Sequence, residues 1–158
     1  MKKFLLTATP LLCALLMTKL ASAAEAWQRY ESYQITARNA PRQLVDPDYL
    51  SPRLIANYRA ASDETKEQML GMFAFPNWFA RVDSHHEART ARGHCLTVNG
   101  YSDEAEWLTA SLLYVPAQAG LVLDDADIAF HESQADQPDG AQCPKDARVP
   151  LPQPGRGR

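Results

Sequence analysis

Apolar residues in the first half of the chain recur with the period of a helix. Trp27, Tyr30 and Ala37 fall on one face of a segment that we predict to be an amphipathic helix over residues 26–39. Neighbouring residues in the same segment also alternate between polar and apolar, so a strand stays open as the alternative.

Two further helices are marked by the residues that begin and end them. Ser51 is a good N-cap and Pro52 suits the first helical turn. Ser62 can cap the next helix, where Asp63 lies favourably near the positive end of the helix dipole. Pro76 is expected to end that helix.

The second half of the chain changes to the period of two that is typical of strands. We predict strands over residues 78–90, 94–101, 107–115 and 121–132, with a kink or bulge at Asp124-Asp125 in the last one. The short turns between them favour antiparallel neighbours. Helices followed by a meander indicate one α+β domain, with N-terminal helices packed on a curved antiparallel sheet.

The first residues have the order of an export signal. Lys2 and Lys3 precede an apolar stretch over residues 4–17, and Ala21-Ser22-Ala23 offers a cleavage site. The stretch is too short to span a bilayer, which needs about 20 apolar residues. We therefore expect a signal peptide over residues 1–23, no membrane span after its removal, and a periplasmic or secreted product.

Charge narrows the range of partners. The 158 residues carry a formal charge of −3, and loss of Lys2, Lys3 and Lys19 with the signal peptide would bring it to −6. Nucleic-acid binding is disfavoured because nucleic-acid footprints are positive. A partner with a basic surface would be favoured electrostatically.

Two cysteines remain after the predicted cleavage, and both are expected in an oxidising compartment. Cys95 and Cys143 suggest one disulfide, because no C-x-x-C spacing supports a redox centre. The bond would tie residues 134–158, a Pro- and Gly-rich tail, to the domain formed by residues 24–133. By the loop-entropy argument it would contribute about 4 kcal/mol. Beyond the staple the tail lacks apolar residues to bury and should be disordered.

The order of elements resembles a known superfamily. The helix with Leu54-Ile55-Ala56-Asn57-Tyr58 and the strands over residues 95–101 and 108–115 are similar to small exported proteins of the nuclear-transport-factor-2-like superfamily. The resemblance implies a cystatin-like or cone-like fold, in which three helices wrap against a bent antiparallel sheet. That superfamily holds enzymes, binders and interaction modules, so the resemblance alone does not fix the function.

A metal site is one hypothesis for the first strand. Asp83, His85 and Glu87 alternate and would share one face, where they offer two carboxylates and an imidazole. The same pattern is typical of a solvated strand face, and we favour that interpretation because no spacing such as H-E-x-x-H occurs. We therefore expect no cofactor.

A catalytic pair is the alternative hypothesis for the last strand. Asp127 and His131 share a strand face, and a carboxylate can orient an imidazole as a general base. In a cone fold this pair would suit a hydratase or isomerase. Charged residues at such a position more often protect the edge of a sheet from aggregation.

The surplus of aromatic residues favours binding over catalysis. Tyr101, Trp107 and Tyr114 are the candidates for a ligand or partner surface, with Trp107 and Tyr114 on opposite faces of one strand. The hypothesis is a non-enzymatic periplasmic protein, such as an immunity or inhibitor protein, that recognises a protein or small ligand through its sheet face or cone mouth. A homodimer through the sheet is a further expectation.

Overall fold

The computed structural model describes residues 25–144, and in this part of the chain the helices come first and the strands second. The signal peptide predicted over residues 1–23 and the part of the tail beyond residue 144 lie outside the described residues. The fold class is confirmed as α+β. None of the described helices is long and apolar enough to cross a membrane. The elements are α2 (Glu25–Asn39), η1 (Pro41–Leu44), α3 (Pro52–Ala60), α4 (Asp63–Phe73), η2 (Phe75–Trp78), β1 (Phe79–Thr90), β2 (Gly93–Ser102), β3 (Trp107–Ala117), β4 (Gly120–His131) and η3 (Gln134–Asp136).

The four strands form one antiparallel sheet in the order β1-β2-β3-β4. The register of β3 and β4 shifts where Leu113 faces Asp125 and Tyr114 faces Leu123, so Asp124 is the extra residue of a bulge. The bulge predicted at Asp124-Asp125 is confirmed. Two further irregularities in β1 add to the curl of the sheet, because bulges bend and twist the strand that carries them.

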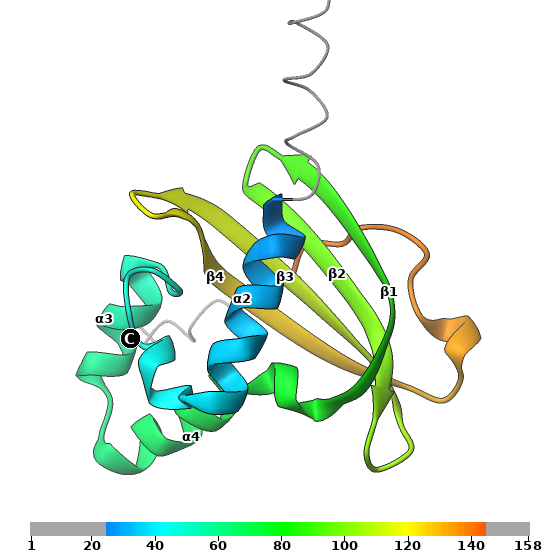
Figure 1. The fold of residues 1–158 in the computed structure, drawn as a ribbon, viewed down its shortest axis with the longest axis horizontal. Helices are drawn as coiled ribbons and strands as arrows, with labels where there is room; N and C mark the ends of the chain where they lie inside the picture. The colour runs from blue at the N-terminus through cyan, green and yellow to red at the C-terminus, as the bar shows by residue number, and fades with distance from the viewer. Residues whose placement is uncertain (1–24, 145–158) are drawn as a thin grey trace, which may run out of the picture.

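Helix α2 lies across the concave face of the sheet (Figure 1). Ala26, Tyr30, Tyr33 and Ala37 recur at intervals of four, three and four residues, and all are buried. The helix predicted over residues 26–39 is confirmed, and the strand alternative is wrong. The sheet residues that share this core are Leu96, Val98, Leu108, Ala110, Leu112, Tyr114, Leu121 and Leu123.

Polar contacts fix α2 along its length. At its N-terminus the Glu87 carboxylate accepts hydrogen bonds from the amides of Ala26 and Trp27, at 3.1 and 3.3 Å. These are unpaired donors of the first helical turn, where negative charge is favourable. In the first half of the helix Arg29 Nε donates to the Leu121 carbonyl at 2.7 Å, which ties α2 to β4.

Helices α3 and α4 lie beside α2 at one side of the sheet (Figure 1). Ser51 and Ser62 cap them as the sequence predicts, each accepting from the amide three residues later. Pro76 does end α4, but it does so inside the short helix η2, which the sequence did not indicate.

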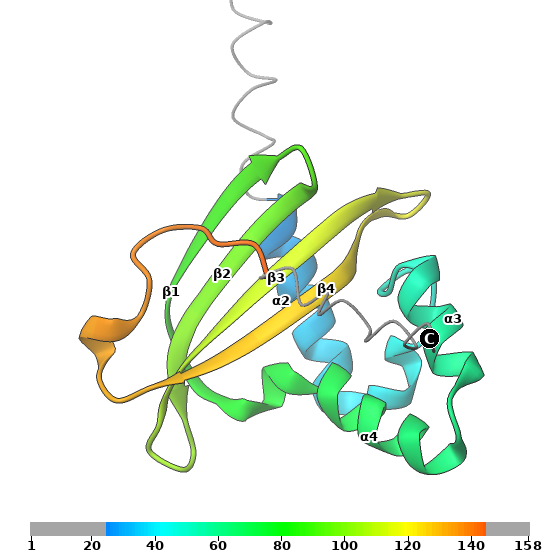
Figure 2. The ribbon, with the colours of Figure 1, turned by 180° about the vertical axis from the view of Figure 1, so that it is seen from behind.

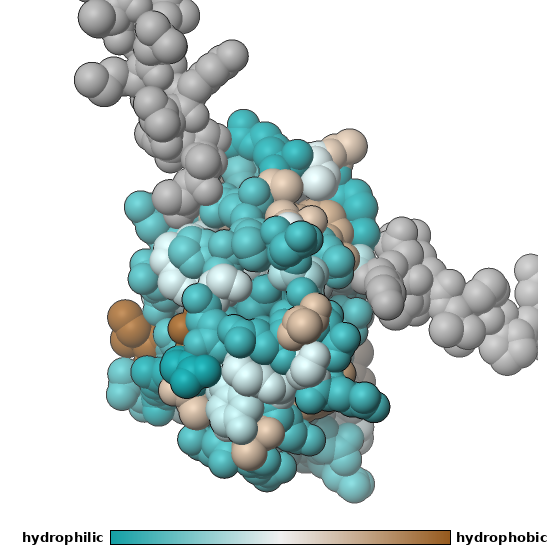
Figure 3. Space-filling view, turned by 90° about the vertical axis from the view of Figure 1, so that its right-hand side faces the viewer, coloured by the Kyte–Doolittle hydropathy of each residue, from teal (hydrophilic) through white to brown (hydrophobic). Residues whose placement is uncertain are grey.

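Residues 134–144, here called the strap, cross the convex face of the sheet opposite α2 (Figure 2). The predicted disulfide between Cys95 and Cys143 is confirmed, with a Cα–Cα distance of 4.8 Å. Thr97 Oγ1 accepts from the Gln142 amide at 2.7 Å, and the Gln137 side-chain amide donates to two carbonyls of β2 and β3. The first part of the predicted tail is therefore packed against the sheet. The side of the molecule that carries β1 is mostly hydrophilic (Figure 3).

A chain of polar side chains under the strap links all four strands. Asn99 Nδ2 donates to Ser84 Oγ at 3.1 Å and to the Pro138 carbonyl at 2.7 Å, while Asn99 Oδ1 accepts from Thr109 Oγ1 at 2.8 Å. Thr109 Oγ1 in turn lies 2.9 Å from His131 Nε2. Asn99 and Thr109 are buried, and these partners satisfy polar groups that would be costly to bury alone.

Three tyrosines of the core are perturbed by burial. Desolvation raises the pKa of Tyr30, Tyr33 and Tyr114 above the ordinary value of about 10. The Tyr33 hydroxyl donates to the Phe73 carbonyl at 2.8 Å, whereas the hydroxyls of Tyr30 and Tyr114 have no partner among the described residues.

We expect the stability of the protein to fall as the pH rises above about 10. The three tyrosines ionise at a higher pH when folded than when unfolded, so the unfolded state releases protons first and is favoured in alkali. Urea unfolding at pH 8–11.5 measures this. Tyr114→Phe should make the decline shallower. Ultraviolet titration of all six tyrosines near pH 10 in the folded chain would contradict it.

Replacing each of two glycines by alanine should change the stability of the fold in opposite directions. Gly71 lies in α4 with nothing within 4 Å of an added Cβ, so Gly71→Ala should stabilise the fold by about 0.5–1 kcal/mol. At Gly100 an added Cβ would collide with the Arg81 carbonyl oxygen, and we expect a loss of about 1–3 kcal/mol. Chemical denaturation of both variants measures the difference, and a neutral Gly100→Ala would show that β1 and β2 are packed differently there.

Candidate functional site

The structure divides the three aromatic residues predicted to form a partner surface. Tyr114 is 1% exposed and lies under α2, so its assignment to a surface is wrong. Trp107 lies on the convex face, which confirms that the two residues take opposite sides of β3. Its ring meets Tyr101 edge-on at 4.7 Å, and the Arg81 guanidinium lies 5.8 Å from the Tyr101 ring centre.

The residues of the metal hypothesis each have another contact. Asp83 forms an ion pair with Arg81 at 2.6 Å, and the His85 ring stacks on Trp27 with 3.9 Å between ring centres. Glu87 caps α2. Within residues 25–144 no three His, Cys, Asp or Glu side chains are grouped so that they could hold a metal ion.

The proposed catalytic pair is not brought together by β4. Asp127 and His131 are four residues apart on one continuous strand, which corresponds to about 13 Å between their Cα atoms. The imidazole of His131 instead contacts the hydroxyl of Thr109 at 2.9 Å. A carboxylate at that separation cannot orient the imidazole, because that requires hydrogen-bond distance.

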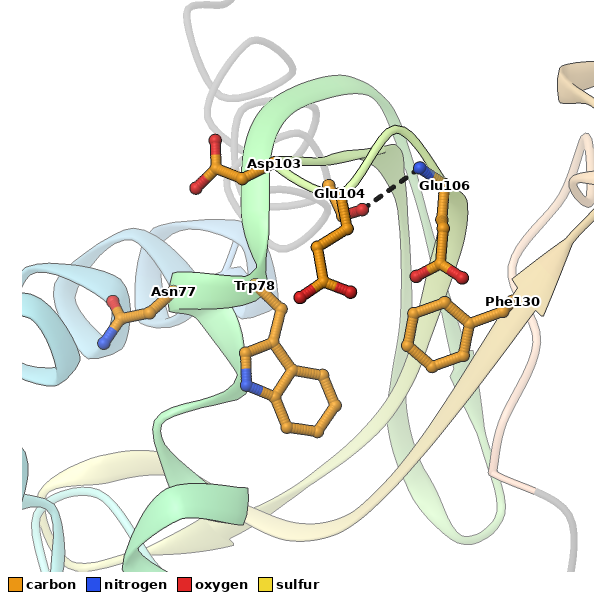
Figure 4. A pocket seen from close by; sticks show the side chains of 7 residues that line it. Asn77, Trp78, Asp103, Glu104, Glu106 and Phe130 are labelled. Carbon is orange, nitrogen blue, oxygen red and sulfur yellow. Dashed lines mark hydrogen bonds between the residues drawn. The ribbon is translucent and has the colours of Figure 1, made fainter.

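An open pocket of about 410 Å³ lies at the end of the sheet where η2, the β2–β3 loop and β4 meet (Figure 4). Two exposed aromatic rings form its walls, with Trp78 40% exposed and Phe130 55% exposed. The carboxylates of Glu104 and Glu106 point towards these rings, whereas the side chain of Asp103 is directed away (Figure 4). We call this the acidic–aromatic pocket. Its lining residues are Asn77, Trp78, Ser102, Asp103, Glu104, Glu106 and Phe130.

Rigid elements hold the two aromatic walls. Trp78 is the last residue of η2, whose Phe75 and Pro76 are buried, and the Asn77 side-chain amide donates to the Ala37 carbonyl of α2 at 3.0 Å. Phe130 lies on β4. The two rings therefore come from segments anchored to the core and can stay exposed without a hydrophobic partner.

The β2–β3 loop presents the two carboxylates on the same side. Ser102 closes this loop, since its amide donates to the Glu106 carbonyl at 2.9 Å and its hydroxyl accepts from the Glu106 amide at 3.1 Å. Ala105 has a φ of 64°, in the left-handed region that an L-residue rarely adopts. This turn places Glu104 and Glu106 above the rings.

The chemistry of the pocket suits a cation. Within residues 25–144 neither Glu104 nor Glu106 forms an ion pair with a basic side chain. Aromatic faces attract cations through the ring quadrupole, and exposed carboxylates add Coulomb attraction. The lining has no histidine or cysteine, the residues most often used for proton transfer and nucleophilic attack near neutral pH.

Comparison with known proteins gives no further guide, since no family model, no curated protein and no solved structure matches the chain.

The sequence contains the aromatic and acidic residues of the pocket, but it does not show that they lie close together in the fold. The sequence pattern places Trp78 at the start of the predicted strand over residues 78–90, and it leaves residues 102–106 as one of the short turns between predicted strands. The available signal was the combination of that acidic loop with aromatic residues at strand ends. It could not be recognised without the position of η2, which turns Trp78 towards the loop.

Proposed function

We propose that this chain is an exported, non-enzymatic binding protein whose acidic–aromatic pocket receives a positively charged group. The observation that carries the proposal is the meeting of two exposed aromatic rings, Trp78 and Phe130, with the carboxylates of Glu104 and Glu106. A guanidinium or alkylammonium group fits this combination, because its charge faces the carboxylates and its flat or apolar part faces the rings.

The expected strength favours a side chain of a larger ligand over a free small molecule. A cation on an exposed aromatic face gains about 0.5–1 kcal/mol, and an exposed ion pair about 0–1 kcal/mol. Two cation–aromatic contacts and two ion pairs together give at most about 4 kcal/mol, which corresponds to a dissociation constant on the order of millimolar. Functional affinity then requires additional contacts outside the pocket, as in a protein partner.

The setting of the protein is consistent with such a partner. The predicted signal peptide would deliver a chain of formal charge −6, which attracts basic surfaces by long-range electrostatics. We therefore propose periplasmic recognition of a basic protein, with an immunity or inhibitor protein as the specific form. The cone-like resemblance agrees with this, because the pocket lies at the open end of the curled sheet.

Arginine amide is the probe that tests the pocket. We expect the Nα-acetylated form, called arginine amide throughout, to quench tryptophan fluorescence with millimolar affinity. Nα-acetylated citrulline amide, its neutral counterpart, should bind at least about tenfold more weakly because it lacks the guanidinium charge. The Glu104→Gln/Glu106→Gln variant should weaken arginine amide binding by a similar factor.

The matched control is Glu31→Gln/Glu64→Gln, which removes the same number of negative charges at exposed residues outside the pocket lining. It should alter the affinity less than twofold. Equal binding of citrulline amide and arginine amide, or equal effects of the two sets of variants, would refute the proposed pocket.

A further inference from the structure

Within residues 25–144, the edge of β4 beside the pocket is not covered by another strand over most of its length. β4 is the last strand of the sheet and pairs with β3 on one side only. On its other side Leu123 donates to the Tyr49 carbonyl and accepts from the Ser51 amide, each at 2.8 Å. Among the described residues no segment pairs with this side of β4 from Asp125 to His131.

One hydrogen bond shows which residues face that open edge. The Ala126 amide donates to the carboxylate of its neighbour Asp125 at 3.0 Å, and so it points away from β3. Backbone groups of an antiparallel strand alternate between its two sides. Ile128 and Phe130 therefore share the direction of Ala126, and their amides and carbonyls face the open edge.

An apolar groove follows the same edge on the concave side. Near Ala126 a pocket of about 190 Å³ is formed mainly by apolar side chains of α3, α4 and β4, among them Met69, Met72 and Phe73. The acidic–aromatic pocket begins at Phe130, four residues further along β4. An added strand would place side chains at positions i and i+4 about 13 Å apart, and so one in each pocket.

Charge on the convex side of the edge selects the partner. Asp125 and Asp127 face Leu113 and Ser111 of β3, so they lie on the convex side of the sheet. Basic side chains on an added strand would meet them directly, whereas a second β4 would bring aspartates together. Like charges placed opposite each other across strands are destabilising, and an edge with these charges discourages self-pairing.

We infer that the open edge of β4 binds an extended, basic segment of a partner protein as a fifth strand. Its outward side chains are basic and face Asp125 and Asp127. Its inward side chains are apolar near Met72 and cationic at the acidic–aromatic pocket. Main-chain hydrogen bonds to Ile128, Phe130 and the carbonyl of Ala126 supply affinity that the pocket lacks, and the two pockets supply specificity. This inference rests on the proposed function, since its cationic end occupies the same pocket.

The probe is a seven-residue peptide with alternating side chains, with lysine at the outward positions and leucine, valine and arginine in order at the inward positions. A second peptide with the reversed sequence is included, so that both the parallel and the antiparallel pairing with β4 are tested. With the full-length chain we expect the better of the two to bind at least about tenfold more tightly than arginine amide. N-methylation of the peptide amides that face β4 should reduce the affinity at least about tenfold, and N-methylation of the other amides less than twofold. The amides that face β4 belong to the inward positions of a peptide antiparallel to β4 and to the outward positions of a parallel one. This difference arises because only alternate amides of a strand face its neighbour.

The results separate the two proposals. Arginine amide binding with no gain from either peptide, or equal losses from both N-methylation patterns, would refute the added strand and leave the pocket standing. If the unmodified chain did not bind arginine amide, the pocket itself would be refuted. If the variant Arg148→Gln/Arg156→Gln/Arg158→Gln bound the peptide about tenfold more tightly, the chain's own C-terminal residues would be the occupant of the edge. Dimers that form as the protein concentration rises would indicate that a second copy occupies it. Either result would overturn the inference.

Discussion

The packing of α2 against the concave face of the sheet is the interaction on which the rest of the structure depends. Tyr30 and Tyr33 fill the curl of the sheet, and Glu87 and Arg29 hold the helix in place by polar contacts. A curled sheet without this helix would offer a deep internal cavity. With the helix present, Tyr114 is covered, and the exposed aromatic residues Trp78 and Phe130 lie at the end of the sheet.

The convex face is closed by a different means. The strap is held by a disulfide and by hydrogen bonds from polar residues of β2, and it buries Thr97, Asn99 and Thr109. These polar residues resemble a solvated surface in the sequence but need the strap to satisfy them. Because α2 covers the concave face and the strap crosses the convex face, the acidic–aromatic pocket and the β4 edge are the regions for which we propose binding.

Local signals in the sequence predicted most of the fold. Ser51 and Ser62 mark helix starts because a side-chain oxygen is required there, and the bulge at Asp124 follows from the break in alternation. The site was harder to predict. The alternation of side chains along a strand predicted that Trp107 and Tyr114 lie on opposite faces of the sheet, but it could not show which face α2 covers. Asp127 and His131 share a face, yet the rise of the strand separates them, and the role of Trp78 depends on the turn made by η2.

The central claim is that recognition occurs at the end of the sheet and not on either face. The three tryptophans report on separate regions, with Trp27 at the start of α2, Trp78 in the pocket and Trp107 on the convex face. A titration of the ¹⁵N-labelled chain with arginine amide, followed through the three indole N–H resonances, tests the claim most directly. The account predicts that the Trp78 resonance shifts most, and a dominant shift at Trp27 or Trp107 would contradict it.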